Sequence, residues 1–308
     1  MKRFSKITTT QLARICGVSQ GTVDRALHNR DDVNAQTRER ILAVAKEYDY
    51  APKLKNGTQE NSMLIGVVLF DLYNEFFSKL AMSLVREAKR AGYSVIFQFS
   101  NKDKQSEKEA LEYFDYIGVD GILLFPVGDD SKEYENYLRS IKKPLVLIGN
   151  KMFHLPFIGI DDEKAMCELS TKLLKCAPIG NILYYAPVLA NESLHATNAQ
   201  RLRLNGFIQA MQEHNRNYQI VTRLEDISNF SAIVCSTDYY ALQVLNHLRQ
   251  PPNLVISGFD NISLLKSMRA NLFTVDYSTD TIAKECLRYI LGQPFHACIP
   301  HEIIKTCE

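Results

Sequence analysis

The chain has 308 residues, 46% of them hydrophobic and 23% charged, so it is long enough and apolar enough to build two or three domains with proper cores. It contains no run of about 18 apolar residues, and no apolar stretch follows Lys2, Arg3 and Lys6, so we expect neither a membrane span nor a signal peptide, and a cytoplasmic location. The seven cysteines are odd in number and scattered, as expected of reduced thiols.

The net charge of +1 hides an asymmetry between the two ends of the chain. Residues 1–60 carry 11 Lys and Arg against 7 Asp and Glu, which gives +4, whereas the remainder carries 25 against 28, which gives −3. A basic N-terminal module on an acidic body suggests a polyanionic partner for that module alone, although a chance surface imbalance of this size is also possible.

The first fifty residues predict three short helices. Thr8 is a candidate cap for a helix over residues 9–16 with Leu12 and Ile15 inward, and Asn34 for a helix over residues 35–48. Between them, Gly17 suits a tight turn and Ser19 a helix start, after which Val23, Ala26 and Leu27 share one face. A short helix after a Gly turn, polar in its first turn, is typical of the recognition helix of a helix-turn-helix module.

This N-terminal stretch resembles the headpiece of the lactose/galactose repressor family of bacterial transcription regulators. The matching residues form one continuous span: Ile7-Thr8, Leu12-Ala13, Gly17-Val18-Ser19, Thr22-Val23, Arg25, Thr37-Arg38, Ile41 and Tyr50-x-Pro52. The resemblance implies a helix-turn-helix DNA-binding headpiece over residues 1–52 and a linker or hinge over residues 53–62.

We assign DNA-contacting roles by side-chain chemistry. Gln20 can pair with adenine and Arg25 with guanine through two hydrogen bonds each, and hydroxyl groups in the Thr8–Thr10 run, including Thr9, and at Ser19 and Thr22 can hold phosphates. Gly21 stands where family members usually carry a larger base-reading side chain, and His28 lies on the same polar side of the helix. A solvated helix in a small bundle is the alternative.

The linker departs from the family pattern. The family usually has a short hinge helix whose Leu wedges into the minor groove. Here Gln59 stands in the wedge position, and Gly57 weakens a helix. Either Leu54 substitutes for the wedge or the linker is flexible, and Lys53 can contact phosphate in either case.

From Met63 onward, short apolar strands alternate with amphipathic helices, which predicts an α/β fold with parallel sheets. The predicted strands are 64–70, 94–99, 121–125, 145–148, 181–185, 219–222, 232–235, 254–257 and 273–276. This pattern resembles the periplasmic-binding-protein type 1 fold, two Rossmann-like lobes that close on a ligand, over residues 63–308. The matching pieces include Asn74-x-Phe76-Phe77, Arg203-x-x-Gly206-Phe207 and Gly258-Phe259-Asp260. One departure is large, because only residues 223–230 are available for the crossover helix after the strand near Val221.

Ligands of such folds bind at the carboxyl ends of the strands, between the lobes. The candidate effector-binding residues that follow from this rule and from the resemblance are Asn74, Phe76, Phe77, Asn150, Arg203, Asp238, Asp260 and Tyr277. An aromatic face suits a sugar ring, Arg203 can fork onto hydroxyls or a carboxylate, and the two Asp residues can accept hydrogen bonds from hydroxyls. Phe76 or Phe77 can equally be core, and Asp260 a helix cap.

The sequence departs at three sites from the motif of sugar-binding relatives. Gly149-Asn150 stand in place of Asp-Arg, Thr237 in place of Asn, and Tyr277 in place of Gln. The pocket therefore holds either a different ligand or a sugar in another pose. The sequence contains no nucleophile elbow, phosphate loop or His-Glu-x-x-His motif, and the spacing of His296, Cys298, His301 and Cys307 fits no common zinc site, so we expect no enzyme, cofactor or metal.

The sequence therefore predicts a cytoplasmic, homodimeric, sequence-specific transcription regulator, a repressor, that binds a double-stranded DNA operator and responds to a small-molecule effector, a carbohydrate or its derivative. A two-fold dimer matches two half-sites of a pseudo-palindromic operator. The alternatives are an architectural DNA-binding protein without effector, a solute-binding protein, and a sugar-modifying enzyme.

Overall fold

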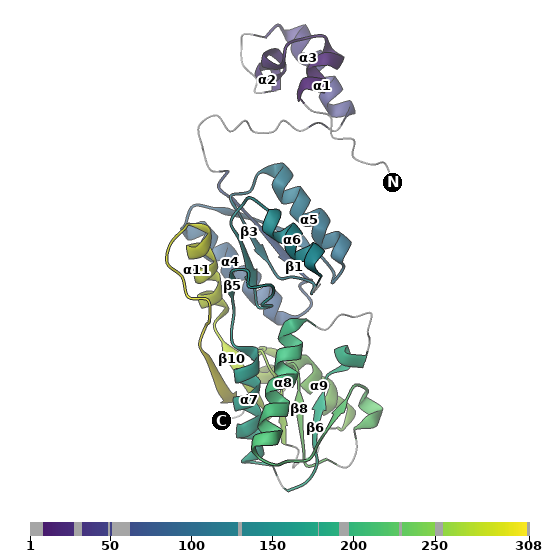
Figure 1. Cartoon of the computed structure of the whole chain (residues 1–308), viewed down its shortest axis with the longest axis vertical. Coiled ribbons are helices and arrows are strands. Elements are labelled where there is room, and N and C mark those ends of the chain that lie inside the picture. The colour runs from purple at the N-terminus through teal and green to yellow at the C-terminus, as the bar shows by residue number, and fades with distance from the viewer. Residues whose placement is uncertain are drawn as a thin grey trace. The chain divides into compact units, whose positions relative to one another are not determined.

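The chain folds into two units, Met1–Glu60 and Asn61–Glu308. A computed structural model describes residues 9–27, 33–48, 50, 62–128, 131–177, 179–190, 197–227, 230–249 and 255–306 (Figure 1). The predicted linker falls almost wholly outside these ranges, and so do Thr8, His28, Lys53 and Leu54, so the roles given to them stay predictions.

The first unit is a bundle of three helices around one small core, as the sequence predicts. The helices are α1 (Thr9–Cys16), α2 (Gln20–Leu27) and α3 (Ala35–Glu47). Leu12, Val23 and Ile41 are each 0% exposed and form the centre of this core. The expectation for Ile15 is wrong: its side chain is 47% exposed, because Ala13 and Cys16 occupy the inward positions beside Leu12.

The second unit contains all nine predicted strands, with bounds within one residue of the prediction where they are described. They form two sheets, each with helices on both faces. Lobe 1 has the strand order β2-β1-β3-β4-β5, and its strands are β1 (Leu64–Leu69), β2 (Ser94–Phe99), β3 (Gly121–Leu124), β4 (Leu145–Ile148) and β5 (Phe157–Ile158). All of these strands pair in parallel.

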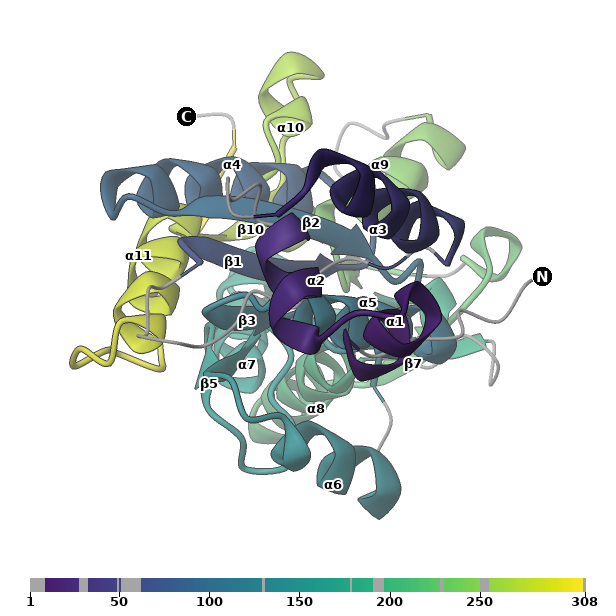
Figure 2. The same ribbon diagram turned by 90° about the horizontal axis from the view of Figure 1, so that it is seen from above.

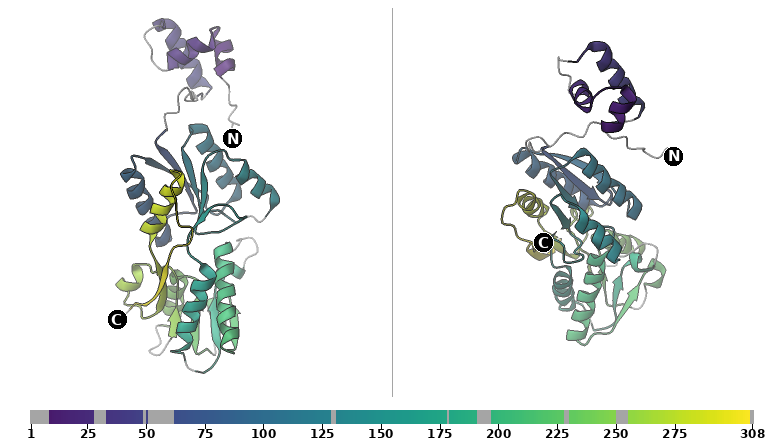
Figure 3. Two further views of the ribbon diagram at one scale, coloured as in Figure 1. Left: turned by 60° about the vertical axis from the view of Figure 1, so that its left-hand side comes forward. Right: turned by 45° about the horizontal axis from the view of Figure 1, so that its top comes forward.

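In lobe 1, helices from distant parts of the sequence cover the same face of the sheet. Helices α4 (Glu75–Arg90) and α11 (Thr279–Ile290) pack side by side on one face, and α5 (Lys104–Ile117) and α6 (Lys132–Ser140) on the other (Figure 1, Figure 3). The apolar side of α4 carries Leu80 and Leu84, both 0% exposed, against the sheet. Lobe 1 is thus completed by a helix from the C-terminal part of the chain.

Lobe 2 has the strand order β11-β10-β9-β8-β6-β7. Its strands are β6 (Ile182–Tyr185), β7 (Tyr218–Val221), β8 (Ala232–Cys235), β9 (Val255–Ser257), β10 (Phe273–Tyr277) and β11 (His301–Lys305). Helices α7 (Asp162–Leu174) and α8 (Asn198–Glu213) cover one face, and α9 (Asp238–His247) and the short α10 (Leu264–Ser267) the other (Figure 1).

Two features of lobe 2 bear on the predictions. In the described part of the crossover after β7, a 3-10 turn, Leu224–Asp226, is the only helical element, as the short length of this segment predicts. Ile220 on the edge strand β7 is 42% exposed. The predicted parallel sheets are confirmed, and one strand that was not predicted, β11, adds an antiparallel edge by pairing with β10. This last strand reaches the sheet after the chain returns from lobe 1.

The chain passes between the lobes three times, and two of the passes touch. They occur between β5 and α7, between β10 and α11, and between α11 and β11. Gly159 in the first pass donates its N–H to the Ala297 carbonyl at 3.0 Å, and Ile299 in the third donates to the Gly159 carbonyl at 2.7 Å. These backbone hydrogen bonds make a paired connection on one side of the space between the lobes.

Candidate functional sites: the helix-turn-helix face and the interlobe cleft

The turn between α1 and α2 has the conformation that its residues favour. Gly17 has a φ of +62°, a left-handed conformation that glycine adopts without strain. The Val18 N–H donates to the Ala13 carbonyl at 3.0 Å, which closes the end of α1. Ser19 then begins α2, since its Oγ accepts from the Thr22 N–H at 3.1 Å. Glycine, valine and serine in this order therefore set the angle between the two helices.

Helix α2 presents a polar face and buries an apolar one. Ser19, Gln20 and Gly21 are exposed, whereas Val23 and Ala26 are buried in the headpiece core. Arg25 is half-buried, one turn beyond the exposed residues. Figure 2 shows α2 as a short helix beside α1 and α3. The face from Ser19 to Arg25 can therefore reach a flat or grooved partner while the opposite face holds the helix in place.

Two of the predicted DNA-contacting residues have partners inside the headpiece. The Gln20 Nε2 donates to Thr10 Oγ1 at 2.5 Å, which holds the Gln20 amide beside α1. The Thr9 hydroxyl bonds the Tyr50 hydroxyl at 2.7 Å and so ties α1 to Tyr50, three residues after the end of α3. Gly21 has room for a side chain, since a Cβ there would meet only Ser19 Oγ at 3.7 Å.

A cavity of about 460 Å³ lies between the lobes of the second unit. Lobe 1 contributes an aromatic wall of four phenylalanines, Phe70, Phe76, Phe77 and Phe125, whose rings meet edge to face at centroid distances of 4.8 to 6.4 Å. Phe76 and Phe77 are 8% and 6% exposed, so each is both core and cavity wall. Asn74 also lines the cavity and caps α4, accepting from the Phe76 N–H at 3.0 Å.

Lobe 2 contributes a buried charged cluster centred on Arg203. Its Nε donates to Asp162 Oδ1 at 2.8 Å, and its Nη2 to Asp260 Oδ1 at 3.3 Å. The third donor, Nη1, bonds the Ser236 carbonyl at 2.9 Å. The side chains of Arg203, Asp162 and Asp260 are 10%, 4% and 6% exposed. Arg203 lies in the second turn of α8, and its side chain lines the cleft.

Burial alters the protonation of this cluster. Desolvation raises the pKa of Asp162 to about 6, with Arg203 opposing the shift. Desolvation also raises the pKa of Asp260, against the opposing effect of Arg203 and of a hydrogen bond from Tyr277 at 2.8 Å. The pKa of the Tyr277 hydroxyl is raised well above its usual value by burial and by the Asp260 charge, so this group is a donor at neutral pH. The cluster offers carboxylate acceptors and a fixed cation to a ligand.

Two candidate effector residues do not line the cavity. Asn150 is 0% exposed. Its side-chain amide donates to the Pro126 carbonyl at 2.9 Å and accepts from the Ala199 N–H at 3.2 Å. Asp238 is 0% exposed and accepts from the Thr274 hydroxyl at 2.7 Å and the Ile262 N–H at 3.0 Å. The polar atoms of Asn150 and Asp238 bind neighbouring segments of the chain. The geometry therefore gives no support to the predicted role of these two residues in effector binding.

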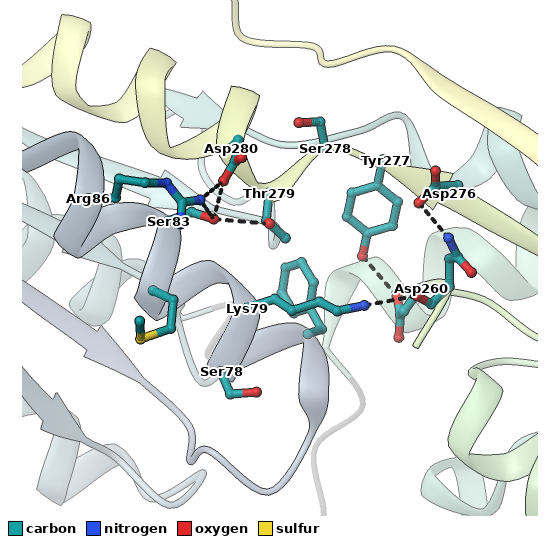
Figure 4. Close-up of a pocket in the computed structure, with 13 residues that line it drawn as sticks. Ser78, Lys79, Ser83, Arg86, Asp260, Asp276, Tyr277, Ser278, Thr279 and Asp280 are labelled. Carbon is teal, nitrogen blue, oxygen red and sulfur yellow. Dashed lines mark hydrogen bonds and ion pairs between the residues drawn. The ribbon is translucent and has the colours of Figure 1, made fainter. Parts of the chain in front are cut away.

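The cavity also involves residues that sequence reasoning missed. Besides Asp162, the polar side chains on its wall include Asp71, Lys102, Thr197, Gln200, Thr237, Tyr239 and Tyr240. Asp162 was detectable in principle, since it follows β5 at the carboxyl edge of the sheet, but that strand has only two residues. A second cavity of about 480 Å³ shares Phe76, Asp260 and Tyr277 with the cleft and opens toward α4 and the start of α11 (Figure 4).

Within the described ranges, no three His, Cys, Asp or Glu side chains gather into a group that could hold a metal ion. His301 instead lies 3.0 Å from a carboxylate oxygen of Glu168. No described helix is long and apolar enough to cross a membrane.

Comparison with protein families gives two matches that together span most of the chain. Residues 9–53 match the model of bacterial regulatory proteins of the lacI family, and residues 62–264 match that of periplasmic binding proteins and the sugar binding domain of the LacI family. Among curated proteins, the sucrose operon repressor of Pediococcus pentosaceus is 27% identical over 284 residues, covering 86% of this chain and 85% of the repressor.

Solved structures share the fold at low sequence identity. The lac repressor dimer bound to operator and the anti-inducer ONPF gives a TM-score of 0.65 at 19% identity, covering 99% of this chain and 100% of that one. A periplasmic binding protein/LacI transcriptional regulator from Alkaliphilus metalliredigens, complexed with D-xylulofuranose, gives 0.64 at 21% identity, covering 80% of this chain and 100% of that one.

Proposed function

Because the chain belongs to the LacI family of bacterial regulatory proteins, we propose that it is a sequence-specific DNA-binding transcription regulator, a repressor, whose operator affinity depends on a small molecule bound between its lobes. The observation that carries this proposal is the pairing, in one chain, of an exposed polar face on α2 with an interlobe cleft that contains a buried charged cluster. The family consists of regulators, and we infer that this chain is likewise no enzyme and acts in the cytoplasm, where the chromosome lies.

On DNA, α2 would enter the major groove. Gln20 is held by Thr10 and would read adenine, and Arg25 would read guanine, each discriminating by about 1–3 kcal/mol. The hydroxyls of Ser19 and Thr22 would hold phosphates and set the position of the helix without reading sequence. Gly21 leaves a gap where a third base contact has room, which predicts a shorter or more tolerant half-site.

A homodimer would place two headpieces on one operator. Exposed apolar side chains on α4 and α10 support a second copy of the chain as the partner: Met82 is 64% exposed, Val85 41%, Leu264 46% and Met268 41%. These two helices are joined, because the Ser263 N–H just before α10 donates to Glu75 of α4 at 2.6 Å. Exposed apolar side chains on one element of each lobe suit an isologous interface that involves both lobes.

The chemistry of the cleft favours an uncharged carbohydrate as effector. Aromatic rings line one wall, and hydroxyl, amide and carboxylate groups line the other, as the apolar faces and the hydroxyl edges of a sugar require. Three carboxylates, Asp71, Asp162 and Asp260, face the cavity against two cations, Lys102 and Arg203. This balance disfavours a phosphorylated ligand. The D-xylulofuranose in the related structure supports a sugar of modest size.

Selection of duplexes from a random library, followed by titration at several salt concentrations, tests the DNA-binding part. We expect a pseudo-palindromic consensus and release of this duplex by one member of a panel containing sucrose, D-xylulose, D-ribose and cellobiose, with glucose 6-phosphate as the charged comparison. A thermal-shift screen of the same panel tests binding directly, since a ligand at 100 times its Kd stabilises by about 2.7 kcal/mol. Steep salt dependence without a consensus would instead indicate an architectural DNA-binding protein. Sugar binding without DNA binding would indicate a solute-binding protein.

A further inference from the structure

The loop from Asp260 to Ser263 connects the effector cleft of lobe 2 to α4 of lobe 1. All four of its backbone N–H groups are hydrogen-bonded. The first three bond within lobe 2, to the Val275 carbonyl at 3.2 Å, to Thr274 Oγ1 at 3.2 Å and to Asp238 Oδ2 at 3.0 Å. The fourth, that of Ser263, crosses to lobe 1 and bonds Glu75 Oε1 at 2.6 Å. Asp238 therefore anchors this loop to lobe 2, and Glu75 anchors it to lobe 1.

A second contact between the loop and α4 lies one helical turn further on. Lys79 Nζ donates to the Asn261 carbonyl at 3.0 Å and forms an ion pair with Glu75 at 2.7 Å. Figure 4 shows the Lys79 side chain extended from α4 toward the Asp260 segment. Two adjacent turns of one helix thus hold both halves of a four-residue loop from the other lobe.

The loop contains one residue in a sparsely populated backbone conformation. Asp260 has a φ of +102°, whereas Asn261, with a φ of +46°, lies near the left-handed region that asparagine tolerates. Asn261 Nδ2 donates to Asp276 at 2.9 Å, but its Oδ1 is buried with no donor among the described residues. Such conformations persist when surrounding contacts over-determine them. A loop of this kind has two reasons to rearrange once its outer contacts are released.

The first residue of the same loop belongs to the effector cleft. Asp260 accepts from Arg203 and from the Tyr277 hydroxyl, and its carboxyl group lies on the wall of the cleft. Asp260, Tyr277 and Phe76 also border the second cavity, on whose far side lie Lys79 and the rest of α4. A displacement of Asp260 by a ligand would therefore move the segment that Glu75 and Lys79 hold.

We propose that Glu75 and Lys79 form a latch on the 260–263 loop, through which occupancy of the cleft at Asp260 is transmitted to lobe 1. The inference rests on the proposed function and names two positioning residues for it, since neither lines the cleft. With the latch intact, lobe 1 and the loop move together. With the latch broken, a ligand can still fill the cleft, but lobe 1 no longer responds to it.

The test uses the full-length protein with Glu75→Ala, Lys79→Met and both together. Arg86→Met is the matched control, because Arg86 lies on the same helix, lines the same second cavity and pairs with Asp280 of α11 within lobe 1 without touching the loop. The first readout is hydrogen–deuterium exchange of the segment 260–264, which needs no ligand and no DNA. We expect exchange about tenfold faster in the latch variants and unchanged in the control.

The second readout is the ratio of the dissociation constants of the panel sugar that binds, measured with and without the selected operator. We expect a ratio in the usual allosteric range of about 5–150 for the parent and the control, and a ratio near 1 for the latch variants, which still bind the sugar. Unchanged exchange in all variants, or an unchanged ratio, overturns the latch. If no sugar binds the parent, the effector part of the proposed function has failed, and the exchange measurement alone decides whether the latch exists.

Discussion

The Arg203 guanidinium carbon lies 3.6 Å from the centroid of the Phe259 ring, so the cation stacks on an aromatic face while its nitrogens bond two carboxylates. The ring covers one face of the guanidinium plane, and the hydrogen bonds lie in that plane. This arrangement explains how a cation that is buried to about nine-tenths is tolerated at the edge of the lobe 2 sheet. It also makes Arg203 the structural centre of the cleft.

We expect Arg203→Met to lower the free energy of unfolding by about 3–5 kcal/mol, because two buried carboxylates lose their cation. Urea denaturation, monitored by circular dichroism, measures this free energy of unfolding. Arg223→Met is the control, since Arg223 forms a pair with Asp226 on the surface, where removal should change little. A loss at Arg203 no larger than that of the control would show that the cluster contributes nothing to stability.

The raised pKa of Asp162 predicts a pH-dependent difference between the parent and Asp162→Asn. The folded state holds a proton on this carboxyl up to a pH of about 6, whereas the ordinary pKa is 3.8. This group therefore favours the folded state below pH 4, and its contribution is lost as the pH rises through 6. The variant stays neutral, so its stability relative to the parent should rise by about 2 kcal/mol between pH 4 and pH 7. Parallel stability curves over this range would contradict the assignment.

Helices α7 and α8 approach so closely at Gly206 that a side chain there has no space. A Cβ on Gly206 would lie 2.0 Å from the Glu163 carbonyl oxygen, which belongs to the backbone of α7. We expect Gly206→Ala to destabilise by about 1–3 kcal/mol, although alanine favours a helix by about 1 kcal/mol. Gly21→Ala, in an exposed position on α2, is the matched helical substitution and should not destabilise. Thermal unfolding of both variants makes the comparison.

Much of the fold followed from the sequence because its signals are local. Ser19 and Asn34 begin α2 and α3 as predicted, since short polar side chains at helix starts bind free N–H groups. Strands such as Leu145–Ile148 were found because four consecutive buried apolar residues follow a proline. Strand β5 was missed because two residues are too few to show an alternating hydrophobic pattern. Strand β11 was missed because it is an edge strand without a fully buried residue.

The site was predicted less completely, because side-chain partners depend on distant segments. Asp238 and Asp260 each lie three residues after the end of a lobe 2 strand and look alike in sequence. Asp238 bonds the Thr274 hydroxyl and a backbone N–H, whereas Asp260, at a φ of +102°, turns to Arg203 and the cleft. No local sequence pattern distinguishes the hydrogen-bond partners of Asp238 from those of Asp260. Asp162 was missed because the strand before it has only two residues and because its partner, Arg203, lies 41 positions away along the chain.

The most direct test of the account is to select DNA duplexes with the parent protein and with Gln20→Ala and Arg25→Ala. We expect a pseudo-palindromic consensus for the parent. For each variant we expect a relaxed preference at one base pair per half-site, and binding to the parent consensus that is weaker by about 1–3 kcal/mol. A parent protein without sequence preference, or variants that keep the full consensus and affinity, would contradict the claim that α2 reads an operator.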